Sequence, residues 1–314
     1  MKRAIQTNIY QKLVLTGLIL TIIHTPGFRN DSAQANESFY LSTTLKHYDY
    51  LFSYLEDAQI PLTEVQDLFL DPRVEFYTDI AINWLQPPVM NNYSSGSFQN
   101  TDKYYEIEDF LHTYKKELKR AEKLYKVEKE TITAILLIET RLGKIVGKHS
   151  VFNILSSLAM ADQPPSLELI KNYINANFND LDHYSRQKLI TDYHERAIRK
   201  AEMARAEFVS LIKLWQQAQL EILEIPGSRA GAFGYPQFMP SSLLRYGIDG
   251  DNDGKVDLYN YHDAIMSVAN YLHAKGWGTE IDSQYKALLR YNYSQAYADN
   301  VIAIANSIKN EMIF

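Results

Sequence analysis

The sequence predicts a mainly α-helical protein with little strand. Over most of the chain, apolar residues recur three and four positions apart, which places them on one face of a helix. No long run alternates apolar and polar residues with the two-residue period of a half-buried strand. Residues 132–138 are apolar nearly all round, as expected of a helix that is buried on every side. We therefore expect this helix to run through the middle of the domain.

Further helices and one unusual loop are expected along the chain. An apolar stripe over 110–125 predicts one helix that buries a single face, and 194–220 is long, amphipathic and rich in good helix formers. Residues 91–100 are dense in turn formers, so we expect a leading helical subdomain over 36–100. Residues 226–240 contain three glycines and three prolines among apolar side chains. This composition favours a loop that lines a groove.

The composition is that of an ordinary globular protein. Hydrophobic residues make up 46% of the 314 residues, which is enough to bury the core of one large domain or two modest ones. The formal charge is −6 and no long basic run is present, so a nucleic-acid partner is not expected. The chain has no cysteine. This excludes disulfides, thiolate zinc sites, a cysteine nucleophile and a lipid-modified N-terminal cysteine, so the protein is not a lipoprotein.

The N-terminus predicts export. Basic residues precede an apolar run at 13–23, which has the length of a signal-peptide hydrophobic region and is short for a membrane span. The sequence Ala-Gln-Ala at 33–35 has the small-x-small pattern of a cleavage site. We therefore expect a signal peptide over 1–35 and a periplasmic or cell-envelope location. The alternative is an uncleaved N-terminal membrane anchor.

Glu139 is the first candidate catalytic residue. It lies at helical spacing from three apolar residues between 132 and 136, so its carboxyl shares their face and loses part of its solvation. Desolvation raises the pKa of a carboxyl, as a general acid that works near neutral pH requires. Alternatively, Glu139 caps the end of its helix at the surface, or pairs with Arg141 or Lys144.

An acidic segment at 249–257 predicts a metal site. Its aspartates occupy positions 1, 3, 5 and 9, and glycine occupies position 6, as in an EF-hand calcium loop. Asn260 stands at position 12 in place of the usual glutamate, and Asp263 is the nearest acid able to close the site. Bound calcium would tie the loop to the following helix and act structurally. The alternative is a solvated acidic turn.

Tyrosine is abundant, with 23 residues. Aromatic faces with a polar tip pack on sugar rings, although core packing is the alternative for each ring. Four of these residues lie near the glycine-rich loop or in the last third of the chain: Tyr235, Tyr271, Tyr291 and Tyr297. The sequence contains no Ser-His-Asp order, Walker loop or His-Glu-x-x-His motif, so the common nucleophilic and zinc-hydrolase mechanisms are not supported.

Four blocks of the sequence occur in an order typical of one enzyme family. They lie at 134–143, 228–242, 249–272 and 289–298. Together they resemble the lytic murein transglycosylase B family of lysozyme-like enzymes. The resemblance implies a lysozyme-like core over 101–314, a helical insertion at about 159–225, an additional helical subdomain before the core and one EF-hand-like loop.

The resemblance also implies roles for individual residues. Glu139 would be the single catalytic acid and base, held by a hydrogen bond from Ser228. The residues that would line the glycan groove are Gln237, Tyr271, Tyr291, Asn292 and Tyr297. The structural calcium ion would be bound by Asp249, Asp251, Asp253, the carbonyl of Lys255 and Asp263. No organic cofactor is expected.

The implied reaction needs one carboxyl, whereas hydrolytic glycosidases normally place two across the scissile bond. The family cuts the MurNAc–GlcNAc β-1,4 bond of peptidoglycan, and the MurNAc 6-hydroxyl closes on C1 to form a 1,6-anhydro end. The alternatives are a hydrolase of the same shape and a non-catalytic wall-binding protein. The expected partner is a peptidoglycan glycan strand, with cell-wall synthesis or division proteins as further partners of a monomeric enzyme.

Overall fold

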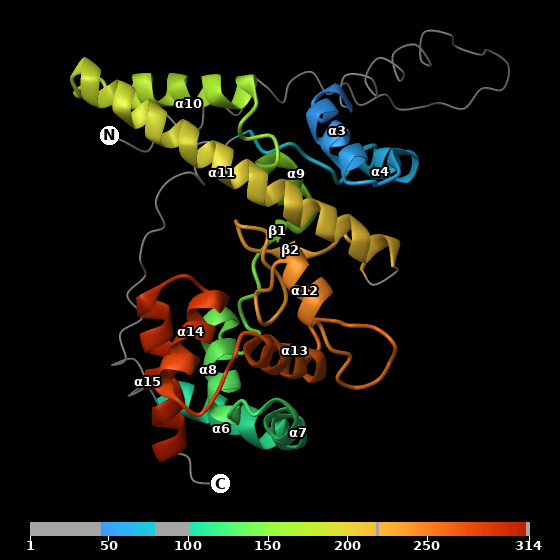
Figure 1. Ribbon diagram of the computed structural model, residues 1–314, viewed down its shortest axis with the longest axis vertical. Coiled ribbons are helices and arrows are strands. Elements are labelled where there is room, and N and C mark those ends of the chain that lie inside the picture. The colour runs from blue at the N-terminus through green and yellow to red at the C-terminus, as the bar shows by residue number, and fades with distance from the viewer. Residues whose placement is uncertain (1–44, 79–100, 218–219, 312–314) are drawn as a thin grey trace, which may run out of the picture. The chain divides into compact units, whose positions relative to one another are not determined.

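The computed structural model describes residues 45–78, 101–217 and 220–311, including side chains from Tyr104 onward in the second range (Figure 1). These residues are mainly helical, so the predicted fold class is confirmed. One pair of short strands is present among them, β1 (His149–Ser150) and β2 (Pro226–Gly227), which are antiparallel. The expected signal peptide lies outside the described residues. Within those residues, no helix has the length and apolar character needed to cross a membrane.

The described part of the predicted leading subdomain consists of two short helices, α3 (Asp49–Asp57) and α4 (Leu62–Phe69). Both bury apolar side chains in the same core as the following helices. The ring of Phe69 lies 5.0 Å from that of Phe152 and 5.9 Å from that of Phe208. The α3–α4 hairpin therefore shares the main hydrophobic core.

The predicted helix over 110–125 is two helices, α6 (Thr101–Thr113) and α7 (Lys115–Tyr125). The prediction of one helix was wrong at Tyr114, whose backbone leaves the helical region with φ −100° and ψ 24°. The Tyr114 ring packs against Tyr261, with 4.6 Å between ring centroids. This tertiary contact overrides the local helical pattern, because propensity is worth only a few tenths of a kcal/mol per residue.

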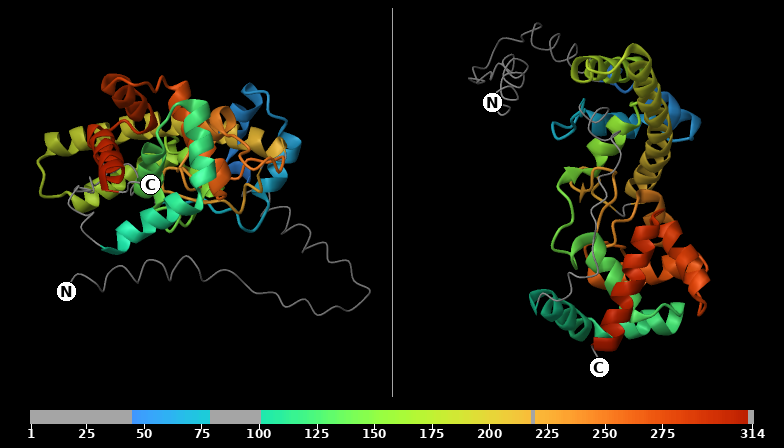
Figure 2. Two further views of the ribbon diagram at one scale, coloured as in Figure 1. Left: turned by 90° about the horizontal axis from the view of Figure 1, so that it is seen from below. Right: turned by 90° about the vertical axis from the view of Figure 1, so that its left-hand side faces the viewer.

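The central helix is α8 (Lys129–Thr140), and its residues from 131 to 136 are all buried. It packs along α15 (Gln295–Glu311) and against α7. Figures 1 and 2 show α8 and α15 side by side. The expectation of a helix buried through the middle of the domain is confirmed, and α15 places the last part of the chain beside the end of α8.

The region between 159 and 225 contains α10 (Pro164–Asn177) and the 34-residue α11 (His183–Gln216). α11 begins earlier than the predicted residue 194 because the side chain of Asp182 accepts a hydrogen bond from the backbone of Ser185 and caps the helix. α10 and the first half of α11 enclose a small core of their own, which includes Ile170, Ile174, Ile190, Tyr193, Ala197 and Ala201.

The second half of α11 packs on α9 (Val151–Leu158) and α12 (Pro240–Tyr246). The glycine-rich loop runs between β2 and α12, and backbone bridges join Phe233 to Gly227 and to Phe238. The chain then continues through the acidic loop into α13 (Tyr261–Ala274) and α14 (Ile281–Tyr291).

Candidate active site

Glu139 lies in the last turn of α8 and its side chain is half-buried. The hydroxyl of Tyr297, from α15, donates a hydrogen bond of 2.7 Å to Oε1 of Glu139. Burial raises the pKa of Glu139 to about 7, and the Tyr297 hydrogen bond offsets part of that rise because it favours the ionised form. Near neutral pH this carboxyl is therefore able both to donate and to accept a proton.

The two cations that follow Glu139 have another partner. Arg141 and Lys144 both form ion pairs with Glu106 of α6, at 3.0 and 2.8 Å. Their hydrogen bonds, that from Lys144 foremost, hold the pKa of Glu106 below its usual range. The structure thus binds these cations to Glu106, so the alternative that Glu139 is an ion-pair partner of Arg141 or Lys144 is wrong.

Three of the predicted groove tyrosines are packed together beside Glu139. The ring of Tyr291 is stacked at 6.2 Å from Tyr297 and meets Tyr271 edge-on at 4.9 Å. Burial raises the pKa of Tyr271 to about 12. Burial, together with the negative charge of Glu139, raises the pKa values of Tyr291 and Tyr297 well above the usual value for tyrosine. All three hydroxyls are therefore neutral donors at neutral pH.

The hydroxyls of this tyrosine cluster already have partners. That of Tyr291 donates to the carbonyl of Pro236 at 2.6 Å, and that of Tyr271 donates to the carbonyl of Arg290 at 2.5 Å. The first of these bonds joins the cluster to the glycine-rich loop, one residue before Gln237. The cluster thus forms a wall of side chains from α13, α14 and α15 that is bonded to that loop.

The two remaining predicted groove residues, Gln237 and Asn292, each follow a residue of the hydrogen bond between Pro236 and Tyr291. Gln237 has φ 50° and its side-chain amide donates to the carbonyls of Gly234 and Val146, at 2.9 and 3.3 Å. Asn292 is exposed and follows the last residue of α14. The contact of Gln237 and Asn292 with glycan stays a prediction.

Ser228 has different partners from those expected. Its hydroxyl accepts hydrogen bonds from the backbone of Ala230 and Ala232, at 3.3 and 3.2 Å, and so shapes its own turn. Among the hydrogen bonds of the described residues, none joins Ser228 to Glu139, and Tyr297 is the side chain that holds this carboxyl. A catalytic role for Ser228 stays a prediction.

Sequence reasoning missed one residue beside the candidate catalytic carboxyl of Glu139. Thr140 is fully buried, and its hydroxyl donates to the carbonyl of Tyr235 at 2.9 Å and accepts from the backbone of Gly143 at 3.0 Å. A threonine four positions after the buried Leu136 was the available signal, because such a residue lies on the buried face. The partner 95 positions away could not be read from the local pattern.

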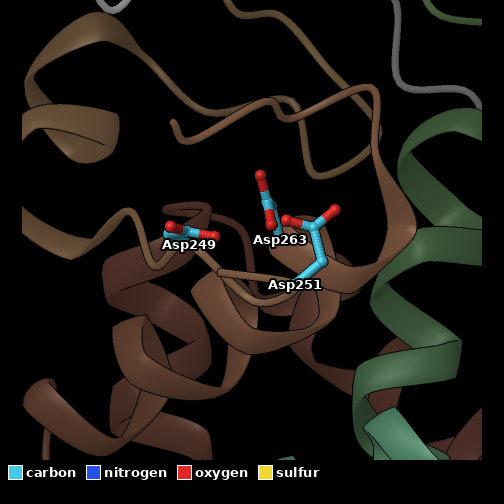
Figure 3. A group of neighbouring side chains, drawn as sticks. All are labelled: Asp249, Asp251 and Asp263. Carbon is cyan, nitrogen blue, oxygen red and sulfur yellow. The ribbon is translucent and has the colours of Figure 1, made fainter. Parts of the chain in front are cut away.

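The acidic loop gathers three of the five predicted calcium ligands. Carboxylate oxygens of Asp249, Asp251 and Asp263 lie within 4.8 Å of one another (Figure 3). Asp253 is not part of this group and instead accepts a hydrogen bond from the backbone of Lys255 at 2.9 Å. Ligation by Asp253 and by the Lys255 carbonyl therefore stays a prediction.

Asp263 closes this acidic cluster from the first turn of α13. It is 1% exposed, and its two oxygens accept hydrogen bonds from the backbone of Gly250 and Asp257, at 2.7 and 2.6 Å. Burial raises the pKa of Asp263, and the charges of Asp251 and Asp249 add to the rise. Three carboxylates gathered in this way fit a hard cation such as Ca²⁺, which takes oxygen ligands.

The mainly helical fold, with a half-buried glutamate at the end of its central helix, is of the lysozyme-like class. Residues 86–285 match the family model described as the transglycosylase SLT domain, and the chain belongs to this family. The match includes Glu139, the glycine-rich loop and the acidic loop, whereas Tyr297 lies beyond it.

A curated relative and several solved structures are similar to this chain. Membrane-bound lytic murein transglycosylase B of Escherichia coli K12 is 33% identical over 168 residues, which are 54% of this chain. The match spans 37% of that relative, so it corresponds to about a third of the longer protein. Soluble lytic transglycosylase SltB1 from Pseudomonas aeruginosa is 23% identical with a TM-score of 0.65, covering 85% of this chain and 99% of its own.

Two further solved structures share the fold and contain ligands. Lytic transglycosylase Slt35 of Escherichia coli, in complex with calcium, is 20% identical with a TM-score of 0.62, covering 84% of this chain and 93% of its own. SltB3 from Pseudomonas aeruginosa, in complex with NAG-anhNAM-pentapeptide, is 19% identical with a TM-score of 0.54, covering 84% of this chain and 79% of its own.

Proposed function

We propose that this chain is a peptidoglycan lytic transglycosylase that cuts the MurNAc–GlcNAc β-1,4 bond and leaves a 1,6-anhydroMurNAc end. The observation that carries this proposal is the half-buried Glu139, whose pKa is about 7 and whose carboxyl receives one tyrosine hydrogen bond. Among the described residues, no second carboxyl contributes to the pKa of Glu139. A single acid that also serves as a base suits a reaction in which the substrate supplies the nucleophile.

The reaction then follows two proton transfers at Glu139. The protonated carboxyl gives its proton to the oxygen that links MurNAc to GlcNAc while the bond from that oxygen to MurNAc C1 breaks. The MurNAc N-acetyl group stabilises the positive charge that develops at C1. The resulting carboxylate takes the proton of the MurNAc 6-hydroxyl while the oxygen of that hydroxyl bonds to C1. Glu139 returns to its protonated form, and no water is consumed.

The wall beside Glu139 is proposed to hold the glycan. The rings of Tyr271, Tyr291 and Tyr297 are mostly covered and their hydroxyls are bonded, so they support the groove more than they reach into it. Gln237 and the exposed Asn292 offer amide groups suited to sugar hydroxyls and N-acetyl groups. The complex of SltB3 with a peptidoglycan fragment supports a glycan substrate for this fold.

A structural calcium ion is proposed at the acidic loop, with Asp249, Asp251 and Asp263 as its carboxylate ligands. The three-carboxylate cluster supports this assignment, as does the calcium complex of Slt35. Asp253 and the Lys255 carbonyl would complete the coordination after a small rearrangement of the loop. When bound, the ion would offset the negative charge of the cluster and stabilise the folded state by mass action.

The cell envelope is the proposed location, because peptidoglycan lies there and the matched relative is a membrane-bound murein transglycosylase. The proposal includes export by the signal peptide over 1–35. It also includes a monomeric enzyme that works beside cell-wall synthesis or division proteins.

Mass spectrometry of the products from purified peptidoglycan tests the proposed reaction. A lytic transglycosylase releases fragments with 1,6-anhydroMurNAc ends, whereas a lysozyme-like hydrolase releases reducing ends that are one water heavier. Reducing ends alone would establish the hydrolase. Binding to peptidoglycan without any cleavage, under conditions in which a related enzyme cleaves it, would establish a wall-binding protein.

A further inference from the structure

The hydroxyl of Thr140 connects three segments at the end of the catalytic helix. It donates to the carbonyl of Tyr235 in the glycine-rich loop at 2.9 Å, and it accepts from the backbone of Gly143 in the turn after α8 at 3.0 Å. It also lies 3.3 Å from the carbonyl of Leu136 in its own helix. Thr140 is fully buried, so water cannot replace these partners.

The turn on one side of Thr140 has an unusual backbone. Arg141 and Leu142 both have φ 52°, and Gly143 has φ 80°. Residues other than glycine rarely adopt this left-handed backbone conformation, so contacts from other segments must hold the turn. Besides the bond from Gly143 to Thr140, the hydroxyl of Tyr261 donates to the carbonyl of Leu142 at 2.7 Å. A Cβ at Gly143 would lie 2.3 Å from that Tyr261 hydroxyl, so the turn fits closely against this ring.

The segment on the other side of Thr140 leads directly to the groove wall. The backbone N–H of Tyr235 donates to Leu258 at 2.9 Å, and the Tyr235 ring stacks on Tyr261 at 4.2 Å. The next residue is Pro236, whose carbonyl receives the hydroxyl of Tyr291. Tyr235 is therefore held by Leu258, Tyr261 and Thr140, and Thr140 is the contact that comes from the residue adjacent to the catalytic acid.

We infer that Thr140 is a positioning residue for the proposed reaction. Its hydroxyl fixes the end of α8, which carries Glu139, against the loop that carries Gln237. Glu139 protonates a glycan that the loop helps to hold, so the separation of the two segments sets the distance between acid and scissile oxygen. This inference rests on the proposed function, because the effect concerns catalysis at Glu139.

Loss of the hydrogen bond from Thr140 to the Tyr235 carbonyl should mainly lower kcat. A displacement of about 1 Å between an acid and its substrate lowers a rate by as much as roughly a hundredfold. Binding depends on many contacts along the groove, so KM should change much less than kcat. The pH profile should keep its alkaline limb, because the contact between Tyr297 and Glu139 is untouched.

A set of matched substitutions separates an effect on the position of Glu139 from an effect on the stability of the fold. Thr140→Val removes the hydroxyl at nearly constant volume, and Thr140→Ser keeps it. The control is Thr133→Val in the same helix, because Thr133 is also fully buried and its hydroxyl bonds only within α8, to the carbonyl of Lys129 at 2.8 Å. Thr140→Ala provides a second hydroxyl-free variant if the valine does not fit.

The measurements are kcat and KM for release of anhydro ends, with melting temperatures for all four variants. Thr140→Val and Thr140→Ala should lower kcat roughly tenfold to a hundredfold. Thr140→Ser and Thr133→Val should stay within about threefold of wild type, although Thr133→Val loses thermal stability as Thr140→Val does. Equal kcat for Thr140→Val, Thr140→Ala and Thr133→Val would overturn the inference. An inactive wild type, or one that yields only reducing ends, would overturn the proposed function and this inference with it.

Discussion

Glu139 and Asp263 are both shielded carboxyl groups with raised pKa values, yet their surroundings differ. Glu139 is half-buried and receives one hydrogen bond, from the neutral hydroxyl of Tyr297. Asp263 is 1% exposed, accepts two backbone hydrogen bonds and lies beside Asp249 and Asp251. Burial is the largest cause of the raised pKa in both cases.

The difference lies in what each set of partners does. The backbone groups around Asp263 bind both of its oxygens and tie α13 to the acidic loop, so removal of this carboxyl leaves polar groups without partners. The single bond on Glu139 leaves one oxygen available to a substrate. A raised pKa alone therefore does not identify a catalytic acid, and the number and kind of partners must be read with it.

The largest effect is expected from Glu139→Gln. The amide keeps the size of the side chain but has no proton to transfer, so cleavage should fall by at least about a thousandfold. The release of anhydro ends measures this loss, and circular dichroism verifies the fold. The matched control is Glu202→Gln, an exposed position on α11, which should cleave like wild type. Normal turnover by Glu139→Gln would remove this residue from the mechanism.

The next effect, on stability, is expected from Asp263→Ala. Loss of the carboxyl leaves the backbone N–H groups of the buried Gly250 and of Asp257 without acceptors, which costs about 2–4 kcal/mol of unfolding free energy. Asp253→Ala is the control, because Asp253 is exposed and outside the cluster, and in calcium-free buffer it should cost less than about 1 kcal/mol.

Urea unfolding with calcium and with EDTA makes this second test sharper. Calcium should stabilise the wild type and not Asp263→Ala, because binding to the folded state alone raises its stability. If calcium leaves the wild-type curve unchanged, the cluster is an acidic turn that holds no calcium. Equal losses for the two alanine variants in calcium-free buffer would contradict the structural role given to Asp263.

The pH dependence of stability should distinguish Glu139 from an ordinary surface carboxyl. Its pKa of about 7 in the folded state exceeds the ordinary value of 4.5, so the folded state holds this proton more tightly. The resulting stability is fully present below pH 4.5 and is lost as the pH rises through 7. Glu139→Gln avoids this loss, and should exceed the wild type by about 1–3 kcal/mol at pH 8 while matching it near pH 4.5. Melting curves at both pH values check this, and a constant difference would contradict it.

Features set by local spacing could be predicted from the sequence. The helical class, the buried α8, Glu139 on its apolar face and the Asp263 closure of the acidic loop all follow from repeats within a few residues. The resemblance placed Tyr297 in the groove, but its bond to Glu139 joins positions 158 apart. The break at Tyr114 likewise depends on a ring from α13. Such contacts arise when distant segments pack, and no local pattern specifies them.

A smaller change in rate is expected from Tyr297→Phe. The variant loses the hydrogen bond that favours the ionised form of Glu139, so the pKa of this carboxyl should rise above about 7. The protonated acid then persists to higher pH, and the alkaline limb of kcat/KM should move upward. The rate at neutral pH should fall roughly tenfold, because the carboxyl is less well held and is a weaker acid.

The control for this change is Tyr285→Phe, which removes a tyrosine hydroxyl that bonds to Asp299 and the carbonyl of Gln295. This variant should keep both the rate and the pH profile. A downward shift of the alkaline limb in Tyr297→Phe would mean that the tyrosine acts on Glu139 in some other way than by favouring its charge.

The smallest effect is expected from Ser228→Ala. The Ser228 hydroxyl accepts two backbone bonds from its own turn, at 3.2 and 3.3 Å, and these long bonds lie at a half-exposed position where water can replace the oxygen. If the hydroxyl does no more than this, kcat should fall less than about threefold.

If substrate binding brings Ser228 onto Glu139, loss of the hydroxyl should lower kcat roughly tenfold or more. It should also raise the pKa of the Glu139 carboxyl, because a hydrogen bond that favours its charged form would be missing. The kcat–pH profile reports the enzyme with substrate bound, and the kcat/KM profile reports the free enzyme. A pKa shift confined to the kcat profile would place the Ser228–Glu139 contact in the substrate complex, whereas unchanged profiles would leave Tyr297 as the side chain that holds the Glu139 carboxyl.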